Sequence, residues 1–246
     1  GVRNLNDDLS ATAEADRKAR LAVALADARK QLFGGLEMLV QLNAIQSSPE
    51  RESLCASAFK RQAMLETLGE QPQQAALALE AMERHYCNAE KTARDKAHPE
   101  WYYPALNRLA AQLVRQLAAG ATVPVPVDAT GIRCCIEEKV HADPDFYSVV
   151  AGIELDFYLA LAAGTLAAEE ARLVAQFDDL YRQVQAPRWW NSVRDQIDFV
   201  GSQCDGRLSD ADQQACERLR ARLEKMAPRS RTPEPERSLG RYPAFV

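Results

Sequence analysis

Hydrophobic residues near the start of the chain recur at the three-and-four spacing of an α-helix. Between Asp8 and Leu42 the sequence is rich in Ala, Leu, Arg and Glu, and the apolar residues that fall at helical spacing are Leu21, Leu25, Ala28 and Leu32. Gly34-Gly35 interrupts the pattern, and we expect a break or kink there. We therefore assign residues 1–46 to a region built around one long N-terminal helix.

The next three helices carry clear start and stop signals. The segment "SSPE" at 47–50 offers a Ser cap, a first-turn Pro and an acid, and it predicts a helix over about 49–68 that ends at Gly69. Pro72 opens a third helix, whose apolar stripe consists of Ala75, Leu79, Met82, Tyr86, Ala89 and Ala93. A fourth helix begins near Pro99 and ends at Gly120.

The stretch "GATVPVPVDATGIRCC" breaks the helical pattern, because Val-Pro alternation favours extended backbone. It predicts a long loop over residues 120–133. Apolar spacing then predicts four more helices, starting near Asp143, before Leu173, near Trp189 and at Ser209. The chain is thus expected to be all-α, with about eight helices packed as antiparallel hairpins and no strand. Residues 227–246 are rich in proline and charge, and we expect a flexible tail there.

Composition narrows the classes of partner. The 246 residues carry a net charge of −5 with a pI near 5.4, which disfavours nucleic acid and acidic lipid as partners. No uninterrupted apolar run was found that reaches the roughly 18–20 residues a membrane span needs, and no leader is evident, so we expect a cytoplasmic protein. The first residue is Gly1 rather than Met, which suggests either a cleaved tag or an excised fragment and leaves room for an N-terminal partner domain.

Segment 52–93 resembles a tetratricopeptide repeat. Ala56 precedes Phe59 by three in the first helix, Gly69 marks the turn, and the second helix has small residues at Ala75, Ala78 and Ala81. Glu52 stands where the family has tryptophan, the first helix is about a turn too long, and the closing proline is missing. The resemblance implies that residues 47–226 form a tetratricopeptide-like array that binds proteins.

A second resemblance rests on the short motifs "SAFKR" and "YYPALNRLA". They are similar to divergent tetratricopeptide-like modules attached to caspase-like and other effector domains in bacterial conflict proteins. This resemblance implies a partner that is a fused or operon-encoded effector.

The residue types that carry catalysis or bind metal are present without a recognised signature. Cys55 lies among small residues, and we interpret it as packing rather than as a nucleophile, since His85, His98 and His141 are the only imidazoles available as a base. A zinc site from His85, Cys87 and His98 with Cys134 or Cys135 needs ligands that point apart on a helix. Glu154 and Asp156 could act as acid and base, but salt bridges suit them better. We expect no cofactor, no metal and no catalytic residue.

Seven residues are candidates for binding a partner, because aromatic and arginine side chains dominate the energetics of protein recognition: Arg61, Tyr103, Asn107, Arg108, Trp189, Trp190 and Arg194. The alternative is that Arg61 and Asn107 form hydrogen bonds between helices. Only one of Trp189 and Trp190 can point fully into the core.

These patterns favour a non-enzymatic scaffold or regulatory module, which clasps a partner protein on a concave helical surface or controls an attached effector. Two alternatives remain open. One is a small-ligand sensor or enzyme with a pocket under the 120–133 loop. The other is a structural oligomerisation domain.

Overall fold

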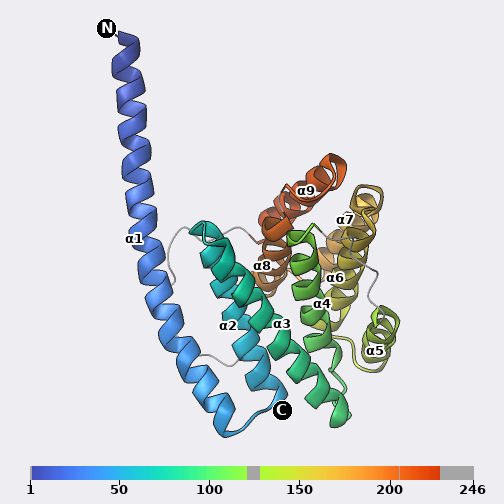
Figure 1. Cartoon of the computed structure of the whole chain (residues 1–246). Coiled ribbons are helices and arrows are strands. Elements are labelled where there is room, and N and C mark those ends of the chain that lie inside the picture. Colours follow the sequence, from blue (N-terminus) through green and yellow to red (C-terminus); the bar gives the residue numbers. More distant parts are fainter. Residues whose placement is uncertain (1, 121–127, 205, 228–246) are drawn as a thin grey trace. The chain divides into compact units, whose positions relative to one another are not determined.

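The computed structural model describes residues 2–120, 128–204 and 206–227, and side chains throughout these ranges except at 2–15, 17 and 18. The described residues form nine α-helices and no strand, which confirms the all-α prediction (Figure 1). The helices are α1 Val2–Ile45, α2 Pro49–Leu68, α3 Pro72–Asp95, α4 Tyr102–Ala118, α5 Ala129–Ala142, α6 Phe146–Ala163, α7 Leu166–Gln183, α8 Pro187–Cys204 and α9 Asp210–Met226.

The chain divides into two compact units, residues 1–85 and residues 86–246. Unit 1 contains α1, α2 and the first part of α3. Unit 2 contains the remainder of α3 and all later helices. The predicted tail 228–246 and most of the predicted Val-Pro loop, residues 121–127, lie outside the described residues.

In unit 1, α1 runs without interruption through Gly34-Gly35, so the predicted break is wrong. Glycine inside a helix costs about 1 kcal/mol relative to alanine, which a long and otherwise favourable helix can absorb. The chain reverses direction at residues 46–48, and α2 then packs against α1 (Figure 1). Ser48 caps the start of α2 by accepting a hydrogen bond from the Arg51 amide, as predicted.

Two polar contacts set the register between α1 and α2. The Arg29 guanidinium donates two hydrogen bonds to the Glu66 carboxylate, at 2.7 and 3.2 Å. Asn43 Nδ2 donates to Glu52 Oε1 at 2.8 Å. In both pairs the residue numbers add to 95, as expected for antiparallel helices. Between Arg29 and Asn43, the α1 positions at steps of three and four include Leu32, Leu36 and Leu39. An apolar seam with a polar contact at each end therefore joins the two helices.

The end of α2 shows why glycine stands at position 69. Gly69 has an ordinary φ of −85°, and the residue that takes a left-handed conformation is Glu70, with φ of 55°. A Cβ at position 69 would collide with the Arg29 guanidinium. Gly69 therefore leaves room for the Arg29 guanidinium beside Glu66, and its backbone conformation does not require glycine.

In unit 2, α6 lies at the centre and packs against α4, α5, α7 and α8. Its residues are apolar around most of the helix, as expected for a helix covered by neighbours. By length and composition the segment Phe146–Ala163 could also cross a membrane, although 56% of it is buried inside the protein. The sequence analysis missed this segment because Glu154 and Asp156 interrupt its apolar run.

Helix α5 corrects the predicted loop. Residues 129–133 belong to α5, so the predicted loop over 120–133 is too long. The helix was also absent from the predicted set of about eight. Its buried residues, Ala129, Ile132, Cys135 and Ile136, follow the helical spacing, but the proline-rich residues before them dominated the interpretation.

Long-range capping holds α7 in place within unit 2. Thr165 precedes α7 but makes no side-chain cap. Instead, the Ala167 amide donates to Asp212 Oδ1 from α9 at 2.8 Å. Asp212 is buried, and its second oxygen accepts a hydrogen bond from Ser209 Oγ at 2.9 Å. One carboxylate therefore joins the N-terminal ends of two helices.

Candidate protein-interaction surface

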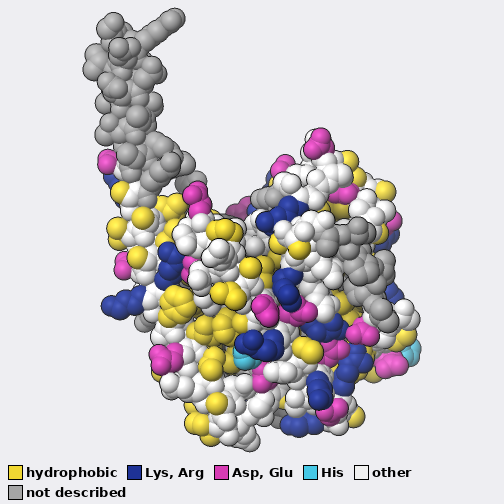
Figure 2. Space-filling model, viewed as in Figure 1, with side chains coloured by type: hydrophobic (Ala, Val, Ile, Leu, Met, Phe, Trp, Pro, Cys, Tyr) yellow, Lys and Arg dark blue, Asp and Glu magenta, His cyan; other side chains and the backbone are white. Residues whose placement is uncertain are grey.

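Unit 1 exposes large hydrophobic side chains. Apart from Tyr103 and Tyr147 in unit 2, all such exposed side chains among the described residues lie on α1, α2 and α3, and Figure 2 shows hydrophobic side chains over the described part of α1. On α1 they are Leu21, Val23, Phe33, Met38, Val40, Leu42 and Ile45, and on α2 and α3 they are Leu54, Leu68 and Leu77. Exposed apolar side chains that form a patch mark interaction sites, so unit 1 is the candidate region.

The apolar residues of α2 are only partly covered. Cys55 and Ala58 are buried, but Leu54 and Leu68 are 47% and 62% exposed. Position 54 and position 68 lie two heptads apart and share the side of α2 that also bears Arg61. The sequence pattern could not separate these residues from the buried ones because all of them are hydrophobic.

Cys55 is a packing residue in this structure. Its side chain is fully buried, and burial raises the pKa of the thiol, with a further contribution from the negative charge of Glu52. His85 lies nearby on α3, but its Nδ1 is 2.7 Å from Glu52 Oε2, and its ring stacks on Phe59 with centroids 5.3 Å apart. A protonated, enclosed thiol is a poor nucleophile.

The Glu52 carboxylate binds three polar groups near the turn between α1 and α2. Its carboxylate oxygens contact Asn43 Nδ2, Ser47 Oγ at 3.0 Å and His85 Nδ1. Burial by itself raises the pKa of this carboxyl, but the hydrogen bonds from Asn43, His85 and Ser47 outweigh burial and lower it. Glu52 thus stabilises the turn between α1 and α2 as an anion.

Three predicted binding residues lie on α4 in unit 2. Tyr103 is 39% exposed, whereas Asn107 and Arg108 are each 9% exposed. Asn107 donates to Tyr103 O in its own helix at 3.0 Å, so the predicted hydrogen bond to another helix is not the one formed. Arg108 donates to Glu90 Oε2 at 2.6 Å and to Asp128 Oδ2 at 3.0 Å, which joins α3, α4 and the start of α5.

Three further predicted residues lie on α8. Trp190 is fully buried and donates from Nε1 to Val184 O at 2.7 Å, while Trp189 is only half-buried, which confirms that one of the two enters the core. Arg194 is 7% exposed; it donates to Ala227 O and pairs with Asp195 at 3.0 Å. Trp189 lies against Phe146, with ring centroids 5.3 Å apart.

Arg61 is the one predicted binding residue in unit 1, and it is exposed. Its guanidinium donates to the oxygens of Ser57 in the same helix, at 2.7 and 3.2 Å. The predicted hydrogen bond to a neighbouring helix is therefore replaced by a bond within α2. Arg108, Asn107, Trp190 and Arg194 are enclosed by unit 2, so Arg61, Tyr103 and Trp189 are the predicted residues that reach solvent.

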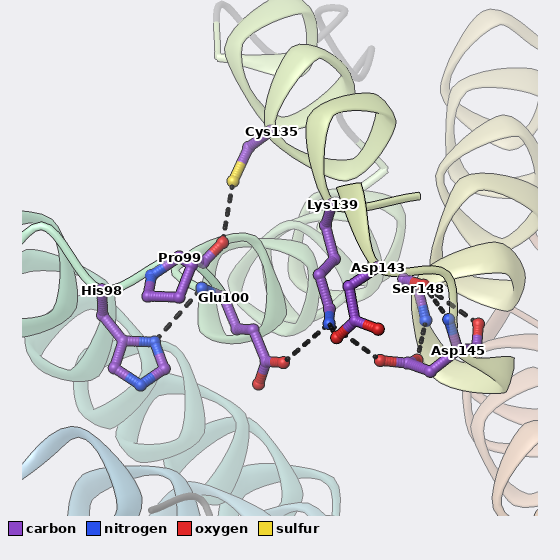
Figure 3. A network of polar contacts seen from close by, with 8 residues as sticks. All are labelled: His98, Pro99, Glu100, Cys135, Lys139, Asp143, Asp145 and Ser148. Atoms are coloured by element: carbon purple, nitrogen blue, oxygen red, sulfur yellow. Dashed lines mark hydrogen bonds and ion pairs between the residues drawn. The ribbon is translucent and has the colours of Figure 1, made fainter. Parts of the chain in front are cut away.

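A polar network joins the segment before α4 to α5 and α6 (Figure 3). Lys139 Nζ lies 2.8 Å from Asp143 Oδ2, 3.4 Å from Asp145 Oδ2 and 3.8 Å from Glu100 Oε1. Cys135 Sγ donates to Pro99 O at 3.4 Å. The hydrogen bond that Lys139 donates to Asp143, together with the negative charges of Asp143 and Asp145, raises the pKa of Lys139, so the network holds a cation.

Asp145 begins α6 with a capping box. Its Oδ1 accepts from the Ser148 amide at 2.8 Å, and Ser148 Oγ accepts from the Asp145 amide at 3.0 Å. The helix was predicted to start near Asp143, two residues before this cap. Asp143 instead pairs with Lys139.

The candidate chemical groups are engaged in structural contacts. Asp156 accepts hydrogen bonds from Arg133 and Arg172, each at 2.5 Å, so the predicted salt bridging is confirmed for this carboxylate. His98 Nδ1 accepts from the Glu100 amide at 3.2 Å. Within the described ranges, no cluster of three or more His, Cys, Asp or Glu side chains is arranged to hold a metal ion.

A surface depression of about 460 Å³ lies between α5 and α6. Its lining consists of Ile136, Glu137, Val140, His141, Ser148, Val149 and Gly152. It contains neither Glu154 nor Asp156, so it does not assemble the acid and base considered from the sequence. The region under residues 121–127 lies outside the described part of the chain.

Comparison of the chain with protein-family models, with curated proteins and with solved structures gave no match. The exposed apolar side chains of α1 were not predicted from the sequence, because none of them was among the seven candidate binding residues. The available signal was the excess of apolar residues on α1, where hydrophobic positions cover more of the helix than one neighbour can bury.

Proposed function

We propose that the chain is a non-enzymatic protein-interaction module whose binding surface lies on α1 and α2 of unit 1. The observation that carries the proposal is the number of exposed Leu, Met, Phe, Val and Ile side chains on these helices. Covering apolar surface is worth about 25 cal/mol per Å², so a partner that buried these side chains would gain binding energy from them.

Tetratricopeptide-like stacking remains part of the proposal for unit 2. The pairs α4–α5, α6–α7 and α8–α9, together with the contacts of α6 with α4 and α8, support stacked hairpins. The contact between α4 and α8 departs from an open array, in which each hairpin touches only its neighbours. A closed arrangement of this kind leaves little room for a concave groove, which favours unit 1 as the binding surface.

An attached or operon-encoded effector remains the class of partner that the sequence resemblance implies. A photo-crosslinking amino acid placed separately at Phe33, Leu54 and Tyr147 tests this in cells that express the full chain. We expect protein adducts from the unit 1 positions, and fewer from Tyr147, which is exposed to a similar extent at 40%. Absence of protein adducts from both unit 1 positions would contradict the proposed function.

A further inference from the structure

Helix α1 has a second apolar stripe, beside the seam that faces α2. Steps of three and four residues connect eight positions along it: Leu21, Ala24, Ala28, Gln31, Gly35, Met38, Leu42 and Ile45. None of the eight is charged. Apart from Ala28, which is half-buried, all of them are exposed, and Met38 and Ile45 reach 63% and 81%. A sustained heptad stripe of this kind is the pattern by which one helix packs along another.

Gly35 gives independent support for a close neighbour. A Cβ built on Gly35 would meet nothing within 4 Å, so packing inside the chain does not require glycine there. Its φ is not in the left-handed region, so backbone conformation does not require it either. Glycine in a helix interior is unfavourable, and where it persists it commonly permits close approach of another backbone.

The stripe is complementary to itself when two copies run antiparallel. Its positions are symmetric about residue 33, because 21 and 45, 24 and 42, 28 and 38, and 31 and 35 each add to 66. This pairing places Leu42 of one copy opposite Ala24 of the other, and Met38 opposite Ala28. Large side chains thus meet small ones at these layers, which is the arrangement that fills space without voids.

The length of the stripe also suits a dimer. It ends at Ile45, the last residue of α1, and the preceding positions in the same series are Arg17 and Glu14, which are charged. Residues 21–45 span about 36 Å, and the facing half of a helix 10–12 Å across offers roughly 600 Å² over that length. Standard interfaces bury about 800 Å² per partner, so this stripe supplies most of what a specific dimer needs.

From these observations we infer that the second stripe of α1 binds a second copy of this chain, with the two α1 helices antiparallel. The inference rests on the proposed interaction role of unit 1 and adds a second copy of the chain to the effector that was proposed as a partner. The closed symmetry of such a pair uses the same patch on both copies, so assembly stops at two.

The test uses two exposed alanines of α1 that differ in their position on the helix. Ala24 belongs to the stripe, whereas Ala26 points about 200° away from it. For the wild-type full chain, light scattering coupled to size exclusion at about 50 µM should give the mass of a dimer. Ala24→Glu should weaken dimerisation about tenfold or more, because it buries a charge, while Ala26→Glu should leave it unchanged.

A charge-reversal mixture tests the antiparallel register. Leu42→Lys alone should also be monomeric. Mixing it with Ala24→Glu should restore a heterodimer, because one layer then pairs Glu with Lys and its symmetric counterpart keeps Leu42 against Ala24. Far-UV circular dichroism of each variant should match that of wild type, which ensures that loss of the dimer is not loss of the fold.

Three results would overturn the inference: a monomeric wild type, equal effects of Ala24→Glu and Ala26→Glu, or no heterodimer in the mixture. A monomeric wild type that still gives photo-adducts with another protein from Phe33 or Leu54 would overturn the dimer and leave the proposed function standing. Phe33 lies on the opposite side of α1 from the stripe, so it can report a different partner.

Discussion

In unit 2 the arginines beneath the surface are bound to carboxylates or carbonyls of other elements, whereas in unit 1 the longest helix leaves leucine, methionine and isoleucine side chains in solvent. Arg108 is held by Glu90 and Asp128, and Arg194 by Ala227 and Asp195. On α1, by contrast, Met38 and Ile45 are mostly exposed. The difference indicates that side chains in unit 2 stabilise its own fold, while part of the apolar surface in unit 1 remains available to a partner.

The largest expected effect is on unit 2. Arg108→Ala leaves the buried Glu90 carboxylate paired with Arg94, which lies 2.8 Å away and has a side chain that is 40% exposed. Removing one member of a buried ion pair costs about 3–5 kcal/mol. All three tryptophans, Trp101, Trp189 and Trp190, belong to unit 2, so urea unfolding followed by tryptophan fluorescence measures this unit.

The matched control for this change is an arginine in unit 1. Arg61→Ala removes a guanidinium that is bonded to Ser57 of its own helix in solvent. Urea unfolding of both variants followed by far-UV circular dichroism, which reports the helices of both units, should show a change within about 0.5 kcal/mol for Arg61→Ala. Equal losses from the two substitutions would contradict the contrast between a buried and an exposed arginine.

A smaller effect is expected where the two adjacent tryptophans are compared. Trp190→Phe removes ring volume from a fully buried site and leaves Val184 O without its indole donor, so we expect a loss of about 2 kcal/mol. Trp189→Phe changes a ring that is only half-buried, and it should cost under about 1 kcal/mol. Urea midpoints from the fluorescence of the remaining tryptophans measure the loss of stability in each variant. A larger loss from Trp189→Phe than from Trp190→Phe would refute the assignment of Trp190 as the buried ring.

Much of this fold follows from the sequence, for reasons that particular residues illustrate. Local signals in the sequence mark several helix ends correctly. Helix starts are marked by the Ser48 cap and by the first-turn prolines at 49 and 72, and the end of α6 is marked by Gly164, which has a left-handed backbone conformation. They depend on atoms within a few residues of one another. The existence of α5 was hidden because its own signal is weak and prolines stand just before it.

The candidate surface was less predictable, because exposure depends on residues that are distant in sequence. Leu36 and Met38 are equally apolar, yet Leu36 is 7% exposed and Met38 is 63% exposed, since only the first lies in the seam with α2. Arg108 was chosen as a binding residue because arginine is common at interfaces, but its partners Glu90 and Asp128 come from other segments. Pairing of this kind cannot be deduced from spacing along one helix.

Capping distinguishes the two units on a finer scale. Ser48→Ala removes the local cap of α2 in unit 1 and should cost about 1 kcal/mol. Thr165→Ala at the equivalent position before α7 should cost little, because Thr165 makes no side-chain cap and the Ala167 amide bonds to Asp212 of α9. Hydrogen exchange of the first-turn amides in each helix measures both, and stronger deprotection of α7 by Thr165→Ala would contradict the long-range cap.

The smallest effect is an acid-dependent one in unit 2. Burial by itself raises the pKa of Asp156, but hydrogen bonds from Arg172 and Arg133 outweigh burial and lower the pKa below its ordinary value. Its contribution to stability is therefore present above the ordinary aspartate pKa of about 3.9 and is lost as pH falls through the lower folded-state pKa. Both arginines are more than a third exposed, so solvent screens the ion pairs and keeps this effect smaller than the effects of the substitutions described above.

Urea midpoints measured by fluorescence from about pH 5 to pH 2.5 should fall more steeply in wild type than in Asp156→Asn. Parallel curves would show that this carboxylate binds its proton equally in the folded and unfolded chain.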